Sequence, residues 1–313
     1  MRTGVVVDTA CDLPQSYIEK HDIHILPVSL KFGDESYLDT RDPAETQKFF
    51  KKYLSDKKVT VSTEPLSAEA IQTMFLEELV IKYDRVLVIT VSNSFSKIYE
   101  NATKASFTIL NNYQERRKNA GIDGKFYLNV LNSKTAFTGQ AIIVHEAIRL
   151  LHEEKLSFSR LRPMVAALSD HIYTYTIPND LYYIRKRDSR TGEKRLSGFR
   201  YMVAKLLDIK PIVRIHRGET DPIENTRSFD NAVQKLFSRA ERAIEGGLMT
   251  KLIAMSYAGD PTDITRTDPF KNFEKFCLVH GIKTMISVMS TTGGINIGPG
   301  TFSLAYAPIG DEP

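Results

Sequence analysis

Short runs of β-branched and aliphatic residues alternate with longer amphipathic stretches through the first half of the chain. Apolar residues recur with helical spacing in Pro43–Leu54, Ser67–Tyr83, Phe95–Asn119 and Gln140–Lys155, which predicts helices. The apolar runs predict buried strands at Gly4–Asp8, Ile23–Phe32, Arg85–Val91 and Lys125–Leu131. Strands that alternate with helices are typical of the α/β class, with a mainly parallel sheet covered on both faces.

The second half of the chain holds more strand-like runs, with helical stretches between several of them. These runs are His171–Ile177, Lys210–His216, Lys251–Tyr257, Ile282–Ser290 and Thr301–Pro308. A chain of 313 residues, 42 % of them hydrophobic, favours two domains over one large core. We therefore expect two α/β domains, residues 1–168 and 169–313, divided after a helix around residues 161–167.

One segment carries the chain's excess of positive charge. Residues 185–195, RKRDSRTGEKR, hold six basic and two acidic side chains, so their net charge of +4 equals that of the whole chain. The rest of the chain is balanced, which argues against a general surface for polyanions such as nucleic acids. The basic segment is therefore a local feature.

Nothing in the sequence indicates export or membrane insertion. No run of about 18 apolar residues is present to span a bilayer. The opening MRTGVVVDTACDLP turns polar too early for the apolar region of a signal peptide. Cys11 and Cys277 have no second cysteine at metal or redox spacing. We expect a cytoplasmic protein with reduced cysteines.

Hydroxyl and amide side chains follow several of the predicted strands. DTACD follows the first strand, SNSFS (Ser92–Ser96) follows Arg85–Val91, and LNSKTAFTGQ follows Lys125–Leu131, while VSTEP (Val61–Pro65) precedes a helix. The carboxyl ends of parallel strands gather where ligands bind, and a helix N-terminus there suits an anion. The alternative is simple helix capping, which we expect of Asp12 and Ser67. Several such loops together predict a polar cleft without an obvious acid–base pair.

Glycines are concentrated near the end of the chain, in TTGGINIGPGTFSLAYAP (Thr291–Pro308). Glycine permits positive φ and a close approach of the backbone to another group. Gly298-Pro299-Gly300 therefore predicts a sharp turn ahead of a strand, which presents backbone N–H groups and Asn296 to the cleft. The alternative is a tight hairpin that serves packing only.

Standard catalytic and metal-binding signatures are absent. The sequence contains no G-x-x-x-x-G-K-[ST], no G-x-S-x-G and no H-E-x-x-H. His145 and His152 share one face of a predicted helix, and we interpret them as ordinary surface histidines. We therefore expect no metal site.

Six segments in order resemble the DegV family of bacterial fatty-acid-binding proteins, which serve fatty acid kinase. The segments are VVVDTACDLP, STEP, VSNSFSKIYENA, LNSKTAFTGQ, LLDIKPIV and GINIGPGTFSLAY, and they cover essentially the whole chain. The resemblance implies two α/β domains of the DegV type with a long-chain fatty acid bound between them. The acyl chain would fill an apolar tunnel in the C-terminal domain.

The resemblance also implies roles for individual residues. The predicted carboxylate-binding residues are Ser62, Thr63, Ser92, Asn93, Asn296, Gly298 and Gly300. A partner kinase would phosphorylate the carboxylate to an acyl phosphate for phospholipid synthesis, so the protein itself would be a carrier without catalysis, cofactor or metal. The expected partners are the fatty acid, the kinase subunit and, transiently, a membrane surface, with no nucleic acid.

The sequence departs from the family pattern at several points. The family's histidine falls on Asn296, and its Gly-Thr pair falls on Lys97-Ile98. Lys97 either brings charge to the head group or points to solvent. Arg195 matches an arginine implicated in partner docking. We assign docking to Arg195 with Arg187 and Arg190 of the same basic segment, and the alternative is a solvated charged loop.

Two other classes of function remain open. One is a small-molecule hydrolase or transferase that uses Ser92 or Ser94, with His171 or His216 brought in as a base by folding. The other is an adaptor that binds protein or nucleic acid through the basic segment, and such binding would weaken steeply with salt.

Overall fold

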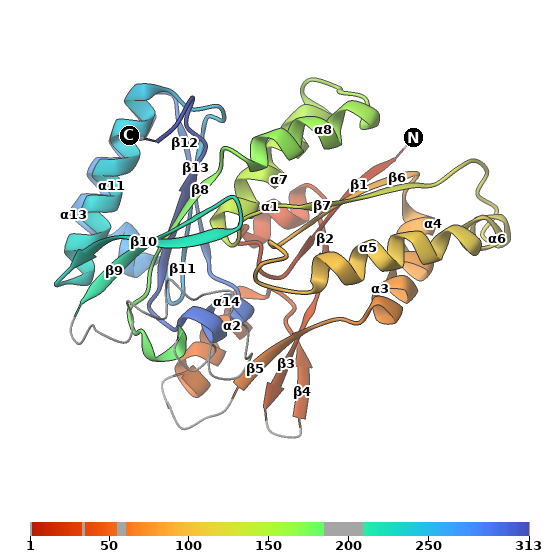
Figure 1. The fold of residues 1–313 in the computed structure, drawn as a ribbon, viewed down its shortest axis with the longest axis horizontal. Coiled ribbons are helices and arrows are strands. Elements are labelled where there is room, and N and C mark those ends of the chain that lie inside the picture. Colours follow the sequence, from red (N-terminus) through yellow and green to blue (C-terminus); the bar gives the residue numbers. More distant parts are fainter. Residues whose placement is uncertain (1, 33–34, 55–60, 185–208, 313) are drawn as a thin grey trace.

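The computed structural model describes residues 2–32, 35–54, 61–184 and 209–312. The predicted docking residues Arg187, Arg190 and Arg195 lie outside the described residues. The described chain forms three sheets with helices packed around and between them (Figure 1). The predicted α/β class is confirmed.

The first sheet is parallel throughout, as predicted, and has the order β2-β1-β6-β7. Its strands are β2 (His24–Leu26), β1 (Thr3–Asp8), β6 (Arg85–Thr90) and β7 (Tyr127–Asn132). Successive side chains of a strand point to opposite faces. Val6 and Val88 thus join one apolar cluster, and Val5, Val7 and Leu87 join another. Both faces are covered, which explains the uninterrupted apolar runs.

The helices of the first half agree with the predicted periodicity, with one break. They are α1 (Gln15–Lys20), α2 (Pro43–Phe49) continued by η1 (Phe50–Leu54), α3 (Ala68–Met74) continued by η2 (Phe75–Leu79) and α4 (Val80–Lys82), α7 (Thr138–His152) and α8 (Phe158–Ser169). The single helix predicted over Phe95–Asn119 is instead α5 (Ile98–Thr108), η3 (Ile109–Asn111) and α6 (Tyr113–Asn119).

A small antiparallel sheet with the order β4-β3-β5 extends below the first sheet. Its strands are β3 (Val28–Phe32), β4 (Glu35–Leu38) and β5 (Val61–Pro65). The predicted strand Ile23–Phe32 is therefore two strands in two sheets, divided at Pro27, which has no N–H for a sheet hydrogen bond. Ser62 and Thr63 lie within β5 and not in a loop.

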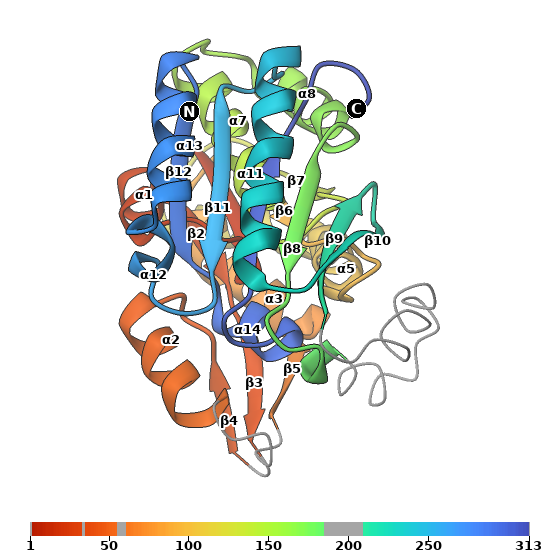
Figure 2. The ribbon, with the colours of Figure 1, turned by 90° about the vertical axis from the view of Figure 1, so that its left-hand side faces the viewer.

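The second sheet has the order β10-β9-β8-β13-β11-β12, and only its β11–β12 pair is parallel. Its strands are β8 (Tyr173–Ile177), β9 (Lys210–His216), β10 (Glu219–Thr226), β11 (Leu252–Tyr257), β12 (Lys283–Val288) and β13 (Phe302–Tyr306). Further helices of the second half are α11 (Phe229–Gly246), α12 (Thr262–Thr265), α13 (Asp268–Val279) and α14 (Thr291–Ile297). α11 and α13 lie side by side over this sheet (Figure 2).

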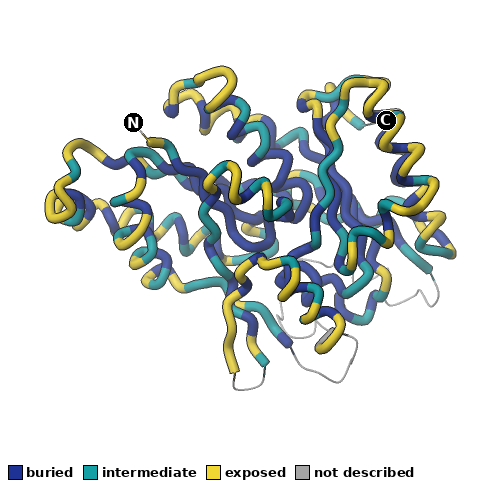
Figure 3. The backbone as a smooth tube through the Cα atoms, turned by 180° about the vertical axis from the view of Figure 1, so that it is seen from behind, coloured by how far each residue is buried: buried dark blue, intermediate teal, exposed yellow. Residues whose placement is uncertain are grey.

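Helix α7 lies between the two large sheets and joins their cores. Ala141 and Val144 of α7 belong to one apolar cluster with Ile89 of the first sheet and Ala254 and Ala305 of the second. Buried residues accordingly follow the strands and α7, whereas exposed residues lie on the outer helices (Figure 3). The predicted division at residue 168 falls near the end of α8, and the division into two domains stays a prediction.

Within the described residues, no helix combines the length and the apolar character needed to cross a bilayer.

Candidate functional site

The glycine-rich segment begins with a short helix, α14. Ser290 caps it, because the Ser290 Oγ accepts a hydrogen bond from Gly293 N at 2.9 Å. A Cβ at Gly294 would lie 2.2 Å from Cε1 of Phe50, so glycine is required where α14 meets η1. At this point the backbone of α14 therefore packs directly against an aromatic ring.

A sharp turn follows α14 and leads into β13, as predicted. Gly298 and Gly300 have φ angles of 97° and 73°, which favour glycine. Their N–H groups donate to Gly294 O and Ala258 O, each at 2.8 Å. These two N–H groups thus hold the turn together within the protein.

Asn296 and Thr63 are brought together although they are 233 positions apart in the sequence. Nδ2 of Asn296 donates to Oγ1 of Thr63 at 3.2 Å and to the carbonyl oxygen of Thr292 at 2.7 Å. Both amide hydrogens of Asn296 are thereby used. The Thr63 hydroxyl accepts one of these bonds and keeps its own proton for a further acceptor. Ser62 lies on the opposite face of β5, because neighbouring strand residues point in opposite directions.

Ser92 and Asn93 form a second polar group, at the carboxyl end of β6. Ser92 is buried, with its Oγ 2.8 Å from that of Ser94, whose hydroxyl also lies 2.7 Å from Gly218 O in the β9–β10 turn. Asn93 is exposed and paired with Asn132 through two hydrogen bonds of 2.9 and 3.3 Å. No hydrogen bond among the described residues joins this group to Thr63 or Asn296. Lys97 is exposed.

Both polar groups border one large apolar cluster, here called the α14 cluster. It combines residues of the first sheet, β5, η1, α14, β9 and the segment 181–184. Val61, Val91, Ile295 and Ile297 are members that lie within two residues of the polar groups in the sequence, and Phe50, Phe137 and Tyr183 are further members. Hydroxyl and amide groups at the edge of an apolar cluster suit an amphiphilic ligand.

Asp8 and Asp12 carry buried carboxyl groups that the sequence analysis did not predict. Asp8 accepts hydrogen bonds from Val91 N at 2.5 Å and Ala10 N at 2.9 Å, and burial raises its pKa to about 6. Asp12 was predicted to cap α1, which is wrong: the cap position is Pro14, without a side-chain hydrogen bond. Burial raises the pKa of Asp12 to about 6 as well, although the nearby Arg41 acts to lower that pKa.

Asp12 instead joins segments that are distant in the sequence. Its carboxylate accepts hydrogen bonds from Ser256 Oγ at 2.6 Å and Ser290 N at 3.0 Å, and it lies 3.3 Å from Nη1 of Arg41. Periodicity carries no signal for such partners, because they come from separate loops. The repeated Asp of DTACD was the only sequence sign of this site.

The histidines do not complete a hydrolytic site. His216 stacks on Tyr173 at 4.0 Å, and its Nδ1 lies 2.9 Å from the carbonyl oxygen of Ile172. Within the described residues, no hydrogen bond joins a histidine to Ser92 or Ser94. His145 Nδ1 lies 3.2 Å from the Tyr17 hydroxyl. The described part of the chain also holds no group of three or more His, Cys, Asp or Glu side chains placed to bind a metal ion.

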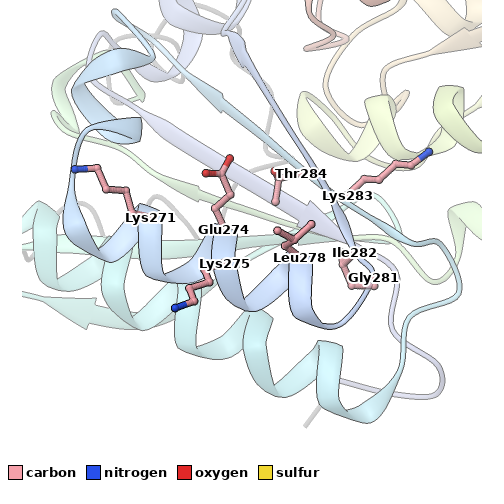
Figure 4. Close-up of a pocket in the computed structure, with 8 residues that line it drawn as sticks. All are labelled: Lys271, Glu274, Lys275, Leu278, Gly281, Ile282, Lys283 and Thr284. Carbon is pink, nitrogen blue, oxygen red and sulfur yellow. The ribbon is translucent and has the colours of Figure 1, made fainter.

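A separate groove of about 700 Å³ lies between α13 and the start of β12, at the end of β12 farthest from α14 (Figure 4). Its lining includes Lys271, Glu274, Lys275 and Leu278 of α13. The groove shares no residue with the Thr63 or Ser92 groups.

Comparison with known proteins gives a consistent set of relatives. A family model described as "Uncharacterised protein, DegV family" matches residues 2–308. A DegV domain-containing protein of Xanthomonas axonopodis pv. citri is 37 % identical over 307 residues, which cover 98 % of each chain. A Thermotoga maritima protein named fatty acid-binding protein is 23 % identical over 303 residues, covering 96 % of each.

Solved structures share the fold along nearly the whole chain. One of them, described as a stearic acid-binding protein from Eubacterium ventriosum, has a TM-score of 0.78 at 21 % identity and covers 98 % of each chain. At this identity the likeness shows the architecture, which matches the arrangement of sheets and helices described above.

Proposed function

Because the chain belongs to the DegV family, we propose that it is a carrier that binds a long-chain fatty acid. The acyl chain would lie in the α14 cluster, with its carboxylate at Thr63. Most members of this cluster belong to residues 1–168, so the proposal places the chain between the two halves and not in a tunnel of the C-terminal half alone. The observation that carries this proposal is the Thr63–Asn296 pair at the edge of that cluster. Relatives described as fatty-acid-binding or stearic acid-binding proteins support it.

The apolar part of the ligand would supply most of the affinity. Burial of each CH₂ group is worth roughly 0.8 kcal/mol, so a long acyl chain gains on the order of 10 kcal/mol. Apolar side chains from several elements of both halves contribute to the α14 cluster. Contacts with such apolar side chains depend on the length and shape of the acyl chain.

The carboxylate needs hydrogen-bond donors wherever it leaves water. Thr63 supplies one, and Asn296 orients it by donating to the hydroxyl oxygen. Asn296 stands where the family motif has histidine, and its side chain is uncharged. The proposed site therefore receives no positive charge from this position. We propose Ser92 as a second donor, whose hydroxyl would turn from Ser94 Oγ, to which it donates in the structure, toward the ligand. Ser62, Asn93, Gly298 and Gly300 stay predictions from the sequence.

We further propose that the bound carboxylate is presented to a partner kinase in the cytoplasm, which converts it to an acyl phosphate for phospholipid synthesis. The carrier itself contributes no catalytic group. Arg187, Arg190 and Arg195 are the proposed docking residues, and loading of the carrier involves transient contact with a membrane.

A titration with a long-chain fatty acid tests the proposed donor. Thr63→Val removes the hydroxyl and keeps the shape, so we expect binding to weaken by about tenfold or more, since a hydrogen bond to a charged group is worth about 1.5–3 kcal/mol. Thr73→Val, at an exposed position of α3, is the matched control and should bind as the wild type does. Unchanged affinity in Thr63→Val would remove Thr63 from the site.

A further inference from the structure

A buried ion pair, Asp12–Arg41, contacts the connection that leads into α14. Asp12 and Arg41 are 1 % and 5 % exposed, and Asp12 Oδ1 lies 3.3 Å from Arg41 Nη1. Asp12 belongs to the loop after β1, and Arg41 belongs to the segment between β4 and α2. Nothing in the proposed binding of a fatty acid uses either residue directly.

The guanidinium of Arg41 reaches the strand that leads into α14. Its Nη2 donates to Leu13 O at 2.9 Å and to Val288 O, the last residue of β12, at 3.4 Å. Asp12 then accepts from the backbone N of Ser290, the residue that caps α14, at 3.0 Å. The ion pair therefore holds both ends of the short connection between β12 and α14.

A second path runs from the Arg41 backbone to the proposed head-group donor. Arg41 N donates to Asp39 Oδ1 at 3.1 Å, and Asp39 Oδ2 accepts from Thr292 N at 2.8 Å and Thr292 Oγ1 at 2.7 Å. Thr292 O accepts from Asn296, which in turn donates to Thr63. A chain of hydrogen bonds through Asp39, Thr292 and Asn296 thus connects Arg41 with the Thr63 hydroxyl.

The local backbone of Arg41 is itself unusual. Its φ of 63° lies in the left-handed region, which is uncommon for a residue with a side chain. A conformation of this kind persists where the surroundings hold it in place. Here the contacts with Leu13, Asp12, Asp39 and Val288 do so.

We propose that Arg41 is a positioning residue that fixes the start of α14 and thereby the orientation of the Thr63 hydroxyl. The first part, the placement of α14, stands on the contacts above. The second part rests on the proposed function, because it assigns the Thr63 hydroxyl to a fatty-acid carboxylate. Lysine cannot replace arginine here, since a single ammonium lacks the planar fork that serves Leu13, Asp12 and Val288 at once.

Arg41→Lys tests the proposal, with Arg149→Lys as the control. Arg149 forms ion pairs with Glu146 and Glu154 at the end of α7, remote from α14. Hydrogen exchange in the ligand-free protein should become at least tenfold faster for the α14 amides in Arg41→Lys, with little change in α11. Arg149→Lys should leave α14 as in the wild type. Uniformly faster exchange, or no change in α14, would overturn the proposal.

A double-mutant cycle tests the link to Thr63. In the wild-type background Arg41→Lys should weaken binding of a long-chain fatty acid about tenfold, whereas in the Thr63→Val background it should add little, because its effect passes through that hydroxyl. Additive losses would contradict the link. If the wild type binds no fatty acid, the proposed function is wrong. Hydrogen exchange of the α14 amides then still tests whether Arg41 fixes the start of α14.

A variant further along the path covers the case in which Arg41→Lys does not fold. Thr292→Val removes the hydroxyl that binds Asp39 and Thr9, and it changes neither Asp12 nor Arg41. Exchange of the α14 amides should accelerate in this variant too, and the affinity for fatty acid should fall. A folded Thr292→Val protein with wild-type exchange and affinity would overturn the proposed path.

Discussion

At the scale of single residues, burial decides what a carboxyl group does. Asp12 stands in a loop where an N-cap is a reasonable prediction, and Asp8 ends β1, yet both carboxyl groups are buried and bound to distant backbone N–H groups. Ser67, in contrast, caps α3 as predicted, with its Oγ accepting from Ala70 N at 3.2 Å. The sequence distinguishes these cases poorly, because local spacing is the same for a cap and for a long-range acceptor.

The buried carboxyl group of Asp8 predicts that the stability of the protein depends on pH. Its folded-state pKa is about 6, above the ordinary value of 3.8, because the ionised form is buried. Between pH 4 and 6 the folded protein therefore binds a proton that the unfolded chain releases, and this group's contribution to stability falls as pH rises through that range.

Asp8→Asn cannot titrate and should lack this dependence. The free energy of unfolding of the wild type, minus that of Asp8→Asn, should be larger at pH 5.0 than at pH 7.5. Urea denaturation at both values measures it, and the histidines common to both proteins cancel in the difference. Parallel pH profiles for the two proteins would contradict the raised pKa.

At the scale of elements, the strength of the periodic signal separates the predicted elements from the missed ones. β1, β6 and α7 carry long apolar patterns and lie where the sequence places them. β4 is exposed at every position, so it has no apolar face to detect. α14 contains Gly293 and Gly294, which are weak helix formers, and tertiary contacts stabilise it instead.

Gly294 therefore resists substitution despite its place in a helix. Gly294→Ala would gain up to about 1 kcal/mol of helix propensity. The new Cβ would, however, lie 2.2 Å from the Phe50 ring, and such overpacking costs typically 1–3 kcal/mol. We expect net destabilisation in thermal unfolding.

Gly246→Ala is the control, because we expect it to change the stability in the opposite direction to Gly294→Ala. Gly246 is the last residue of α11, and a Cβ there would meet no atom within 4 Å. This variant should be slightly more stable than the wild type. A stable Gly294→Ala protein would contradict the tight contact between α14 and η1.

At the scale of the whole molecule, the resemblance to a family predicts which distant residues share a site, and the periodicity of apolar residues does not. The Thr63–Asn296 pair joins positions 233 apart, and no pattern within a single element places them together. The order of six short motifs did imply that they share a site, and the family assignment is confirmed. Ser92 and Asn93, predicted for the same site, form a separate polar group at the edge of the same cluster.

The proposed docking of a partner kinase can be tested separately from ligand binding. Arg195→Ala should keep wild-type affinity for fatty acid and lose most of the phosphorylation by the partner kinase. Arg160→Ala, at an exposed position of α8, should affect neither. Loss of fatty-acid affinity in Arg195→Ala would place that arginine at the ligand instead of the docking surface.

The central claim is that this protein carries a fatty acid, and mass spectrometry of the purified protein tests it most directly. Spectra under native and then denaturing conditions should show release of a ligand with the mass of a long-chain fatty acid, at close to one per chain. That result would also give the chain length. A protein that is empty as purified and takes up no added fatty acid would contradict the account.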